Sequence, residues 1–124
     1  MHYLLWGLQF LMGAFFIGIG VMHFILPPGL PPVMQWMYEL PMWLHVVSGA
    51  AEILGGLGLI LPGLTGIRTE LTPLAAVGLL VIMVFAVVFH LQRGEYQNIV
   101  TNALDAAVLA FIAYGRWRLR PLSR

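Results

Sequence analysis

Long apolar stretches alternate with short polar or proline-rich segments along the whole chain. Four such stretches cover residues 3–26, 42–62, 71–91 and 98–115. A helix rises about 1.5 Å per residue, so roughly 20 apolar residues cross a hydrocarbon core about 30 Å thick. Each stretch therefore predicts a membrane-spanning helix. Together they predict an all-α, polytopic membrane protein whose helices pack as an antiparallel bundle.

The composition agrees with this prediction and excludes other classes. Of the 124 residues, 60% are hydrophobic and 9% are charged, against roughly 25% charged in soluble domains. This leaves room for a single membrane domain, residues 1–124, with residues 116–124 as a short basic tail. The formal net charge of +1 is too weak to indicate nucleic-acid binding. The chain has no cysteine, and therefore no disulfide or thiolate metal site.

Arginine positions predict how the chain is oriented in the membrane. Arg68 lies between the second and third stretches, and four more arginines follow the last one, namely Arg116, Arg118, Arg120 and Arg124. Basic residues accumulate in cytoplasmic loops, so both termini and the second connection are predicted to be cytoplasmic. The first stretch is predicted to be a retained helix, because it lacks the basic start of a signal peptide.

The first connection, residues 27–41, has two halves of different character. Prolines crowd residues 27–32 and predict an irregular turn, because proline lacks a backbone N–H. Residues 33–41 are apolar and aromatic but too short to span the membrane. They predict a short interfacial segment at the outer surface, or alternatively a lid over a site between the helices. Further along, Pro62 and Gly63 predict the end of the second span.

Small residues predict where the helices approach each other closely. In the second span they are Gly49, Gly55, Gly56 and Gly58. In the first span a facing groove is predicted from Gly13, Ala14, Gly18 and Gly20. Membrane helices gain packing energy where small side chains let their backbones meet, so these glycines are interpreted as packing surface.

Polar side chains inside the spans are the candidate functional residues, because they are costly in lipid. They are His23, His45, Glu52, His90, Asn102 and Asp105. The predicted orientation places all six in the outer half of the membrane. No Lys or Arg lies within a predicted span, so histidines are the expected partners of Glu52 and Asp105, in pairs able to transfer a proton. The alternatives are contacts of the histidines with water or headgroups and structural hydrogen bonds of the carboxyl groups.

Several site chemistries remain open for these residues. A metal site is not predicted, because no two histidines have a local ligand spacing such as H-x₃-H. Haem ligation would need His23 or His90 to face His45. A pocket for a quinone or a similar lipophilic molecule needs apolar walls and a few polar contacts, which describes the predicted interior better.

Two motifs resemble those of DoxX-like membrane proteins. Residues 20–24 followed by Pro27 resemble the family's G-x-x-H-F-x-x-P signature, and residues 48–59 followed by Pro62 resemble its S-G-x-x-E-I-x-G-G-x-G-L-x-x-P block. The resemblance implies a four-helix bundle in a bacterial or archaeal cytoplasmic membrane, with His23 and Glu52 as motif residues. It also implies an association with redox complexes or with membrane-protein assembly. Catalysis by this chain alone is not expected, because the sequence has no cysteine, no nucleotide-binding motif and no soluble domain to receive electrons.

Three functions follow as hypotheses. The first is an accessory or anchoring subunit that binds the helices of partner membrane proteins. The second is a quinone-binding component of a membrane oxidoreductase, in which the buried histidines and carboxyl groups handle protons. The third is a small transporter, although no internal repeat typical of transporters is apparent.

Overall fold

The computed structural model describes residues 1–122, which form helices and no strands. In chain order the elements are α1 (His2–Ile25), η1 (Pro32–Glu39), α2 (Met42–Thr65), α3 (Leu71–Arg93), α4 (Tyr96–Tyr114) and η2 (Gly115–Leu119). Here η1 is a 3₁₀-helix, and η2 is a single π-helical turn that prolongs α4. All four α-helices are long and apolar enough to cross a membrane. The predicted all-α fold with four membrane helices is confirmed.

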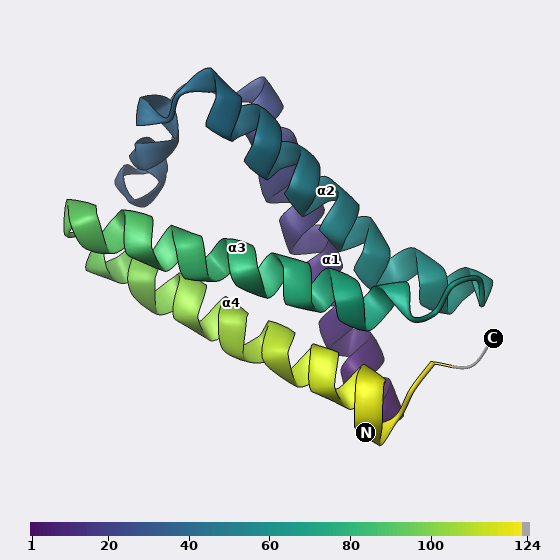
Figure 1. Ribbon diagram of the computed structural model, residues 1–124. Coiled ribbons are helices and arrows are strands. Elements are labelled where there is room, and N and C mark those ends of the chain that lie inside the picture. The colour runs from purple at the N-terminus through teal and green to yellow at the C-terminus, as the bar shows by residue number, and fades with distance from the viewer. Residues whose placement is uncertain (123–124) are drawn as a thin grey trace.

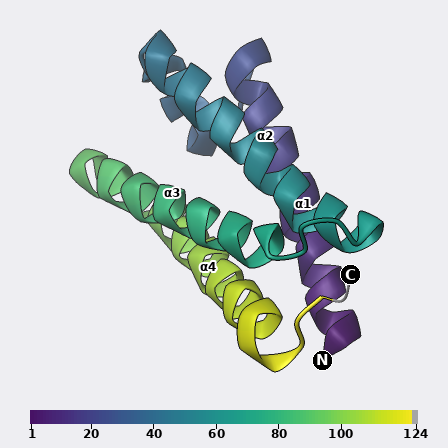
Figure 2. The ribbon, with the colours of Figure 1, turned by 45° about the vertical axis from the view of Figure 1, so that its right-hand side comes forward.

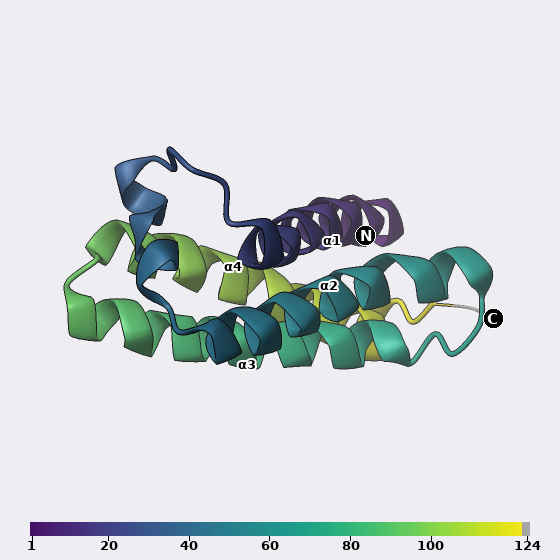
Figure 3. The same cartoon turned by 90° about the horizontal axis from the view of Figure 1, so that it is seen from above.

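The helices form two pairs arranged as a V (Figures 1 and 2). Helix α1 packs along α2, and α3 packs along α4, while contacts between the pairs are fewer. The pairs approach each other at the α2–α3 turn, which we call the closed end. They diverge towards η1, at what we call the open end. Seen from above, η1 lies beside the ends of α3 and α4 that face the open end (Figure 3).

Glycines let α1 and α2 meet backbone to backbone. A Cβ atom on Gly20 would lie 2.7 Å from the carbonyl oxygen of Gly49, and one on Gly49 would lie 2.9 Å from that of Gly20. Gly13 and Gly56 repeat the same contact further along the helices. By contrast, a Cβ on Gly18 would meet nothing within 4 Å. We call this line of contact the glycine seam.

The other two predicted packing glycines serve a different interface. A Cβ on Gly55 would lie 2.7 Å from the Leu79 side chain, and one on Gly58 would lie 2.7 Å from the Cβ of Ala75. Both neighbours belong to α3. Helix α2 therefore presents small residues to α1 on one side and to α3 on another.

The prediction that Pro62 ends the second span is wrong, because α2 continues through it to Thr65. Proline has no N–H to donate to the carbonyl four residues earlier, which is that of Gly58. The hydroxyl of Thr72 in α3 donates to this oxygen at 2.9 Å. The amide of Gln9 in α1 donates to the next carbonyl, Leu59, at 2.7 Å. Neighbouring helices thus satisfy the carbonyls at the proline, and the helix continues.

The predicted basic tail also begins differently from the prediction. Arg116 continues the last helix into η2 and is only 2% exposed. Its guanidinium donates to the side-chain oxygen of Gln9, to the carbonyls of His2 and Arg120, and to Nδ1 of His2. Arg116 therefore ties the end of α4 to the start of α1. The last predicted tail residue, Arg124, lies outside the described residues.

Candidate functional site

A cavity of about 680 Å³ lies between the two helix pairs, towards the open end. Its walls come from all four α-helices and from η1, and most of them are apolar, including Phe16, Ile19, Leu44, Ile82 and Phe89. Ligand pockets in proteins typically have volumes of about 300–1,000 Å³, apolar walls and a few polar groups. The cavity has the size and character of a site for a lipophilic small molecule.

Five of the six predicted site residues line this cavity, namely His23, Glu52, His90, Asn102 and Asp105. His45 does not line the cavity, but it contacts His23, which does. The structure therefore brings together polar groups that lie more than 80 residues apart in the sequence, from His23 to Asp105. Topology alone predicted only that they share a layer of the membrane.

Three of these residues form a buried chain that we call the His–His–Glu triad. Nδ1 of His23 lies 2.9 Å from Nδ1 of His45, and Nε2 of His23 lies 3.1 Å from Oε2 of Glu52. Each residue is at most 5% exposed. Because only one proton fits between the two Nδ1 atoms, one ring donates and the other accepts.

The protonation of the triad follows from that constraint. If His23 donates to His45, one further proton is shared between Nε2 of His23 and the Glu52 carboxyl, and the triad is neutral whichever of the two carries it. If His45 donates instead, His23 can give its Nε2–H to an ionised Glu52, and the triad carries a negative charge. The arrangements differ in where the protons lie along the same two contacts.

Geometry also bears on the alternative of haem ligation. Metal–imidazole bonds are about 2.0 Å long, so two nitrogens on opposite sides of one ion lie about 4 Å apart. The 2.9 Å contact between His23 and His45 leaves no room for an iron between those atoms. Among residues 1–122, no group of three or more His, Asp or Glu side chains is arranged to hold a metal ion.

The segment η1 forms a wall of the cavity. The indole ring of Trp36 packs edge-on against His90, with ring centroids 4.9 Å apart, and its Nε1 is buried without a hydrogen-bond partner. The hydroxyl of Tyr38 donates to the carbonyl of Pro27 and accepts from the N–H of Leu30, and Met37 is fully buried. These contacts match the lid alternative for this segment.

A second imidazole–carboxylate pair lies at the open end. Nδ1 of His90 lies 2.8 Å from Oε1 of Glu95, which also accepts from Nε of Arg93 at 2.9 Å. Arg93 reaches Glu39 of η1 through Nη2 at 2.7 Å, and so ties this segment to α3. Partial burial opposes ionisation of Glu95, but the bonds from His90 and Arg93 outweigh it and lower the pKa of that carboxyl.

Sequence reasoning missed Glu95 and Trp36 as site residues, because both lie outside the predicted spans. One signal was present for Glu95. A carboxylate five residues after a histidine, across a Gly94 turn with a positive φ of 73°, can fold back on the imidazole. No comparable signal places Trp36 against His90, because that contact depends on how η1 folds over the bundle.

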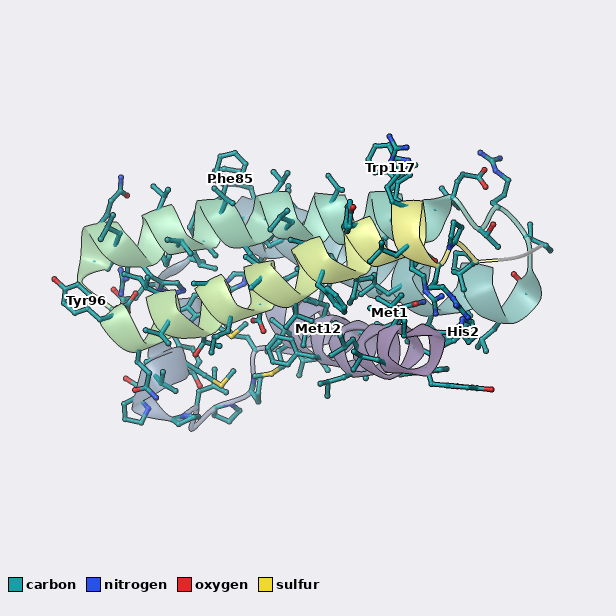
Figure 4. All side chains as sticks on the ribbon, turned by 90° about the horizontal axis from the view of Figure 1, so that it is seen from below. Met1, His2, Met12, Phe85, Tyr96 and Trp117 are labelled. Atoms are coloured by element: carbon teal, nitrogen blue, oxygen red, sulfur yellow. The ribbon has the colours of Figure 1, made fainter. Side chains whose placement is uncertain are left out.

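The cavity also reaches surfaces that face outward from the bundle. Exposed residues line it between α2 and α3, including Val47, Val81 and Phe85. Phe85 projects away from the ribbons, as does Trp117 near the other end of the molecule (Figure 4). The cavity therefore has apolar margins on the outside of the helix pairs, where membrane helices meet acyl chains.

Comparison with known proteins gives one match. The model of a family described as the DoxX-like family matches residues 7–113, which is most of the chain. No curated protein and no solved structure matches the sequence.

Proposed function

The chain belongs to the DoxX-like family of membrane proteins, and from that premise we propose that it binds a lipophilic molecule with a small polar head, of the quinone class, as the membrane component of a larger redox complex. The cavity between its helix pairs is the proposed binding site. The observation that carries the proposal is a largely apolar cavity of about 680 Å³ whose wall holds an unpartnered indole N–H and the carboxyl group of Glu52.

The indole N–H belongs to Trp36, whose Nε1 has no hydrogen-bond partner among residues 1–122. Trp36 lines the cavity, as does Glu52, whose carboxyl group pairs with His23 within the triad. A buried polar group left unsatisfied costs about 1–3 kcal/mol, so a ligand that pairs with it recovers that energy. The indole N–H suits a carbonyl oxygen, and the carboxyl group suits a carbonyl or a hydroxyl. A quinone or quinol head offers these groups at opposite sides of one ring.

The His–His–Glu triad supports a quinone over a simple lipid. Quinone reduction consumes protons as well as electrons, and the proposal gives the imidazoles and the carboxyl group of the triad, at the cavity wall, the role of handling them. The electrons have a different origin, because the chain carries no cysteine to form a thiol or thiolate redox centre. A partner redox protein would supply them. This assigns the chain an accessory role within a complex.

Binding is tested with the purified protein in lipid nanodiscs, titrated with a short-chain ubiquinone and a short-chain menaquinone while tryptophan fluorescence is recorded. We expect saturable quenching for the wild type. Glu52→Gln should weaken binding about tenfold, since a hydrogen bond to a charged or acidic group contributes about 1.5–3 kcal/mol. Trp36→Phe, followed with a radiolabelled quinone, should also weaken binding.

The matched control is Glu70→Gln, which removes an exposed carboxylate beside Arg68, away from the cavity. Equal affinities for the Glu52 and Glu70 variants, or no saturable binding by the wild type, would contradict the proposal. Mass spectrometry of proteins that co-purify after gentle extraction from native membranes tests the accessory role. Redox subunits in stoichiometric amounts are expected. Substrate flux in liposomes holding this protein alone would favour a transporter instead.

A further inference from the structure

We propose that Glu95 and His90 form a proton path from water at the open end into the cavity. The path itself is a property of the free protein. Only the identity of its proton acceptor, a quinone oxygen, rests on the proposed function. Neither Glu95 nor a path through His90 follows from the family motifs around His23 and Glu52.

Access to water distinguishes the titratable groups that line the cavity, namely His23, Glu52, His90 and Asp105. Among residues 1–122, His23 and Glu52 are bonded only within the His–His–Glu triad, whose far end, His45, is only 4% exposed. Asp105 makes no hydrogen bond among residues 1–122. His90 is 1% exposed, yet it is bonded to Glu95, whose side chain is 24% exposed. This pair is the one hydrogen-bonded link, within the described residues, between a cavity-lining titratable group and a carboxylate in contact with water.

The geometry of the pair suits a relay. When Nδ1 of His90 carries no proton, a proton taken up by the Glu95 carboxylate has 2.8 Å to cross from Oε1 to this nitrogen. The imidazole then releases the proton on its other nitrogen, Nε2, to an acceptor in the cavity. One proton enters the ring and one leaves it, and the carboxylate regains its charge. The proton left on Nδ1 donates to Glu95, and rotation of the ring about its Cβ–Cγ bond restores the first tautomer for the next transfer.

Several charged residues contact Glu95 or lie close to it. From α3, Arg93 donates to the same oxygen that faces His90. From η1, Glu39 shares Arg93, so the guanidinium is balanced by two carboxylates. The triad on α1 and α2 lies on the other side of Trp36, whose ring contacts both His23 and His90. From α4, Asp105 lines the same cavity.

The test measures exchange of imidazole N–H protons with solvent in the ligand-free protein, in nanodiscs, by ¹⁵N NMR after selective histidine labelling. All four histidines report in one sample. We expect His90 to exchange about a hundredfold faster than His23, since a positioned proton-transfer group typically accelerates such steps by about 10²–10⁴. Glu95→Gln should bring His90 down to the rate of His23.

Two further variants separate conduction from structure. Glu70→Gln removes an exposed carboxylate beside Arg68, away from the cavity and from Arg93, so His90 should keep the wild-type rate. Glu95→Asp retains a carboxylate beside Arg93 at a longer reach, so it should give an intermediate rate and guards against misfolding of the Gln variant.

Three results would overturn the inference. An unchanged His90 rate in Glu95→Gln means that protons reach the ring by another route. A faster rate means that Glu95 seals the cavity instead. Slow exchange in Asp105→Asn, with Glu95 intact, would place the route along α4. Because no quinone is present, failure of quinone binding leaves this measurement unaffected, and failure here leaves the binding proposal standing.

Discussion

The two ends of the molecule differ in how completely their buried polar groups are hydrogen-bonded. At the closed end Gln9, Thr72 and Arg116 are almost fully buried, and each is hydrogen-bonded to a neighbouring helix or turn. At the open end the buried Nε1 of Trp36 has no hydrogen-bond partner among residues 1–122, and the buried carboxyl group of Glu52 pairs with the imidazole of His23. A polar group in lipid is stabilised when it is paired and costs energy when it is not.

This difference indicates that the closed end holds the fold together. The bonds at the closed end satisfy the carbonyls around Pro62 and fix the start of α1 to the end of α4. The unpartnered indole N–H of Trp36 at the open end belongs to a residue that lines the cavity, where a bound ligand would recover its cost. Polar residues inside the membrane spans are therefore not equivalent, and their hydrogen bonds separate the groups that join helices from those that our proposal places at a binding site.

The largest loss of stability is expected for a substitution that removes hydrogen bonds at the closed end. Arg116→Met removes a guanidinium that donates to Gln9, His2 and Arg120, and leaves the buried Gln9 oxygen without its donor. We expect a loss of about 3 kcal/mol of unfolding free energy, the upper range for buried groups left unsatisfied. Denaturant titration in mixed micelles measures it. The control, Arg118→Met, removes an exposed arginine and should change stability little; equal losses would contradict a structural role for Arg116.

A smaller effect tests the glycine seam, which joins the two ends along α1 and α2. Gly20→Ala places a methyl group 2.7 Å from the Gly49 carbonyl, which cannot move aside as a flexible side chain would. Overpacking of this kind costs about 1–3 kcal/mol. Gly18→Ala is the matched control, because its methyl group meets nothing within 4 Å and alanine favours a helix by about 1 kcal/mol over glycine. Thermal unfolding in nanodiscs should lower the midpoint for Gly20→Ala and maintain or raise it for Gly18→Ala.

The smallest expected effect is a pH dependence of stability that arises at the open end. The bonds from His90 and Arg93 lower the folded-state pKa of Glu95 below the unfolded value of about 4.3. Glu95 therefore contributes stability above the unfolded pKa, and this contribution is lost as pH falls through the folded pKa. We expect the wild type to lose below about 1 kcal/mol relative to Glu95→Gln between neutral pH and the acid range. A constant difference between the two unfolding midpoints across that range would refute the assignment.

Much of the fold was predictable because membrane helices are set by local composition. The four apolar stretches predicted the α-helices to within a few residues at most boundaries, and the two motifs predicted the family. The exceptions arise from tertiary contacts. Pro62 was taken as a helix end because its missing N–H is a local defect, whereas Thr72 and Gln9 repair that defect from other helices. Arg116 was assigned to a tail because burial of an arginine requires acceptors that only the folded chain brings together.

The candidate site was predictable as a set of residues but not as an arrangement. Polar side chains are costly in lipid, and this criterion correctly identified His23, His45, Glu52 and His90 as buried groups. Their partners could not be derived, because a shared depth does not fix which helix faces which. The roles of these residues stay predictions, as does the side of the membrane that each end faces.

The glycine seam has a mechanical consequence. At its two contacts, Gly13 with Gly56 and Gly20 with Gly49, backbone meets backbone, so no side-chain rearrangement can bring α1 and α2 closer together there. The spacing within this helix pair is therefore fixed by the backbones themselves. The cavity lies between this pair and the α3–α4 pair, and the ion pair between Glu39 and Arg93 links η1 to α3 at its open end.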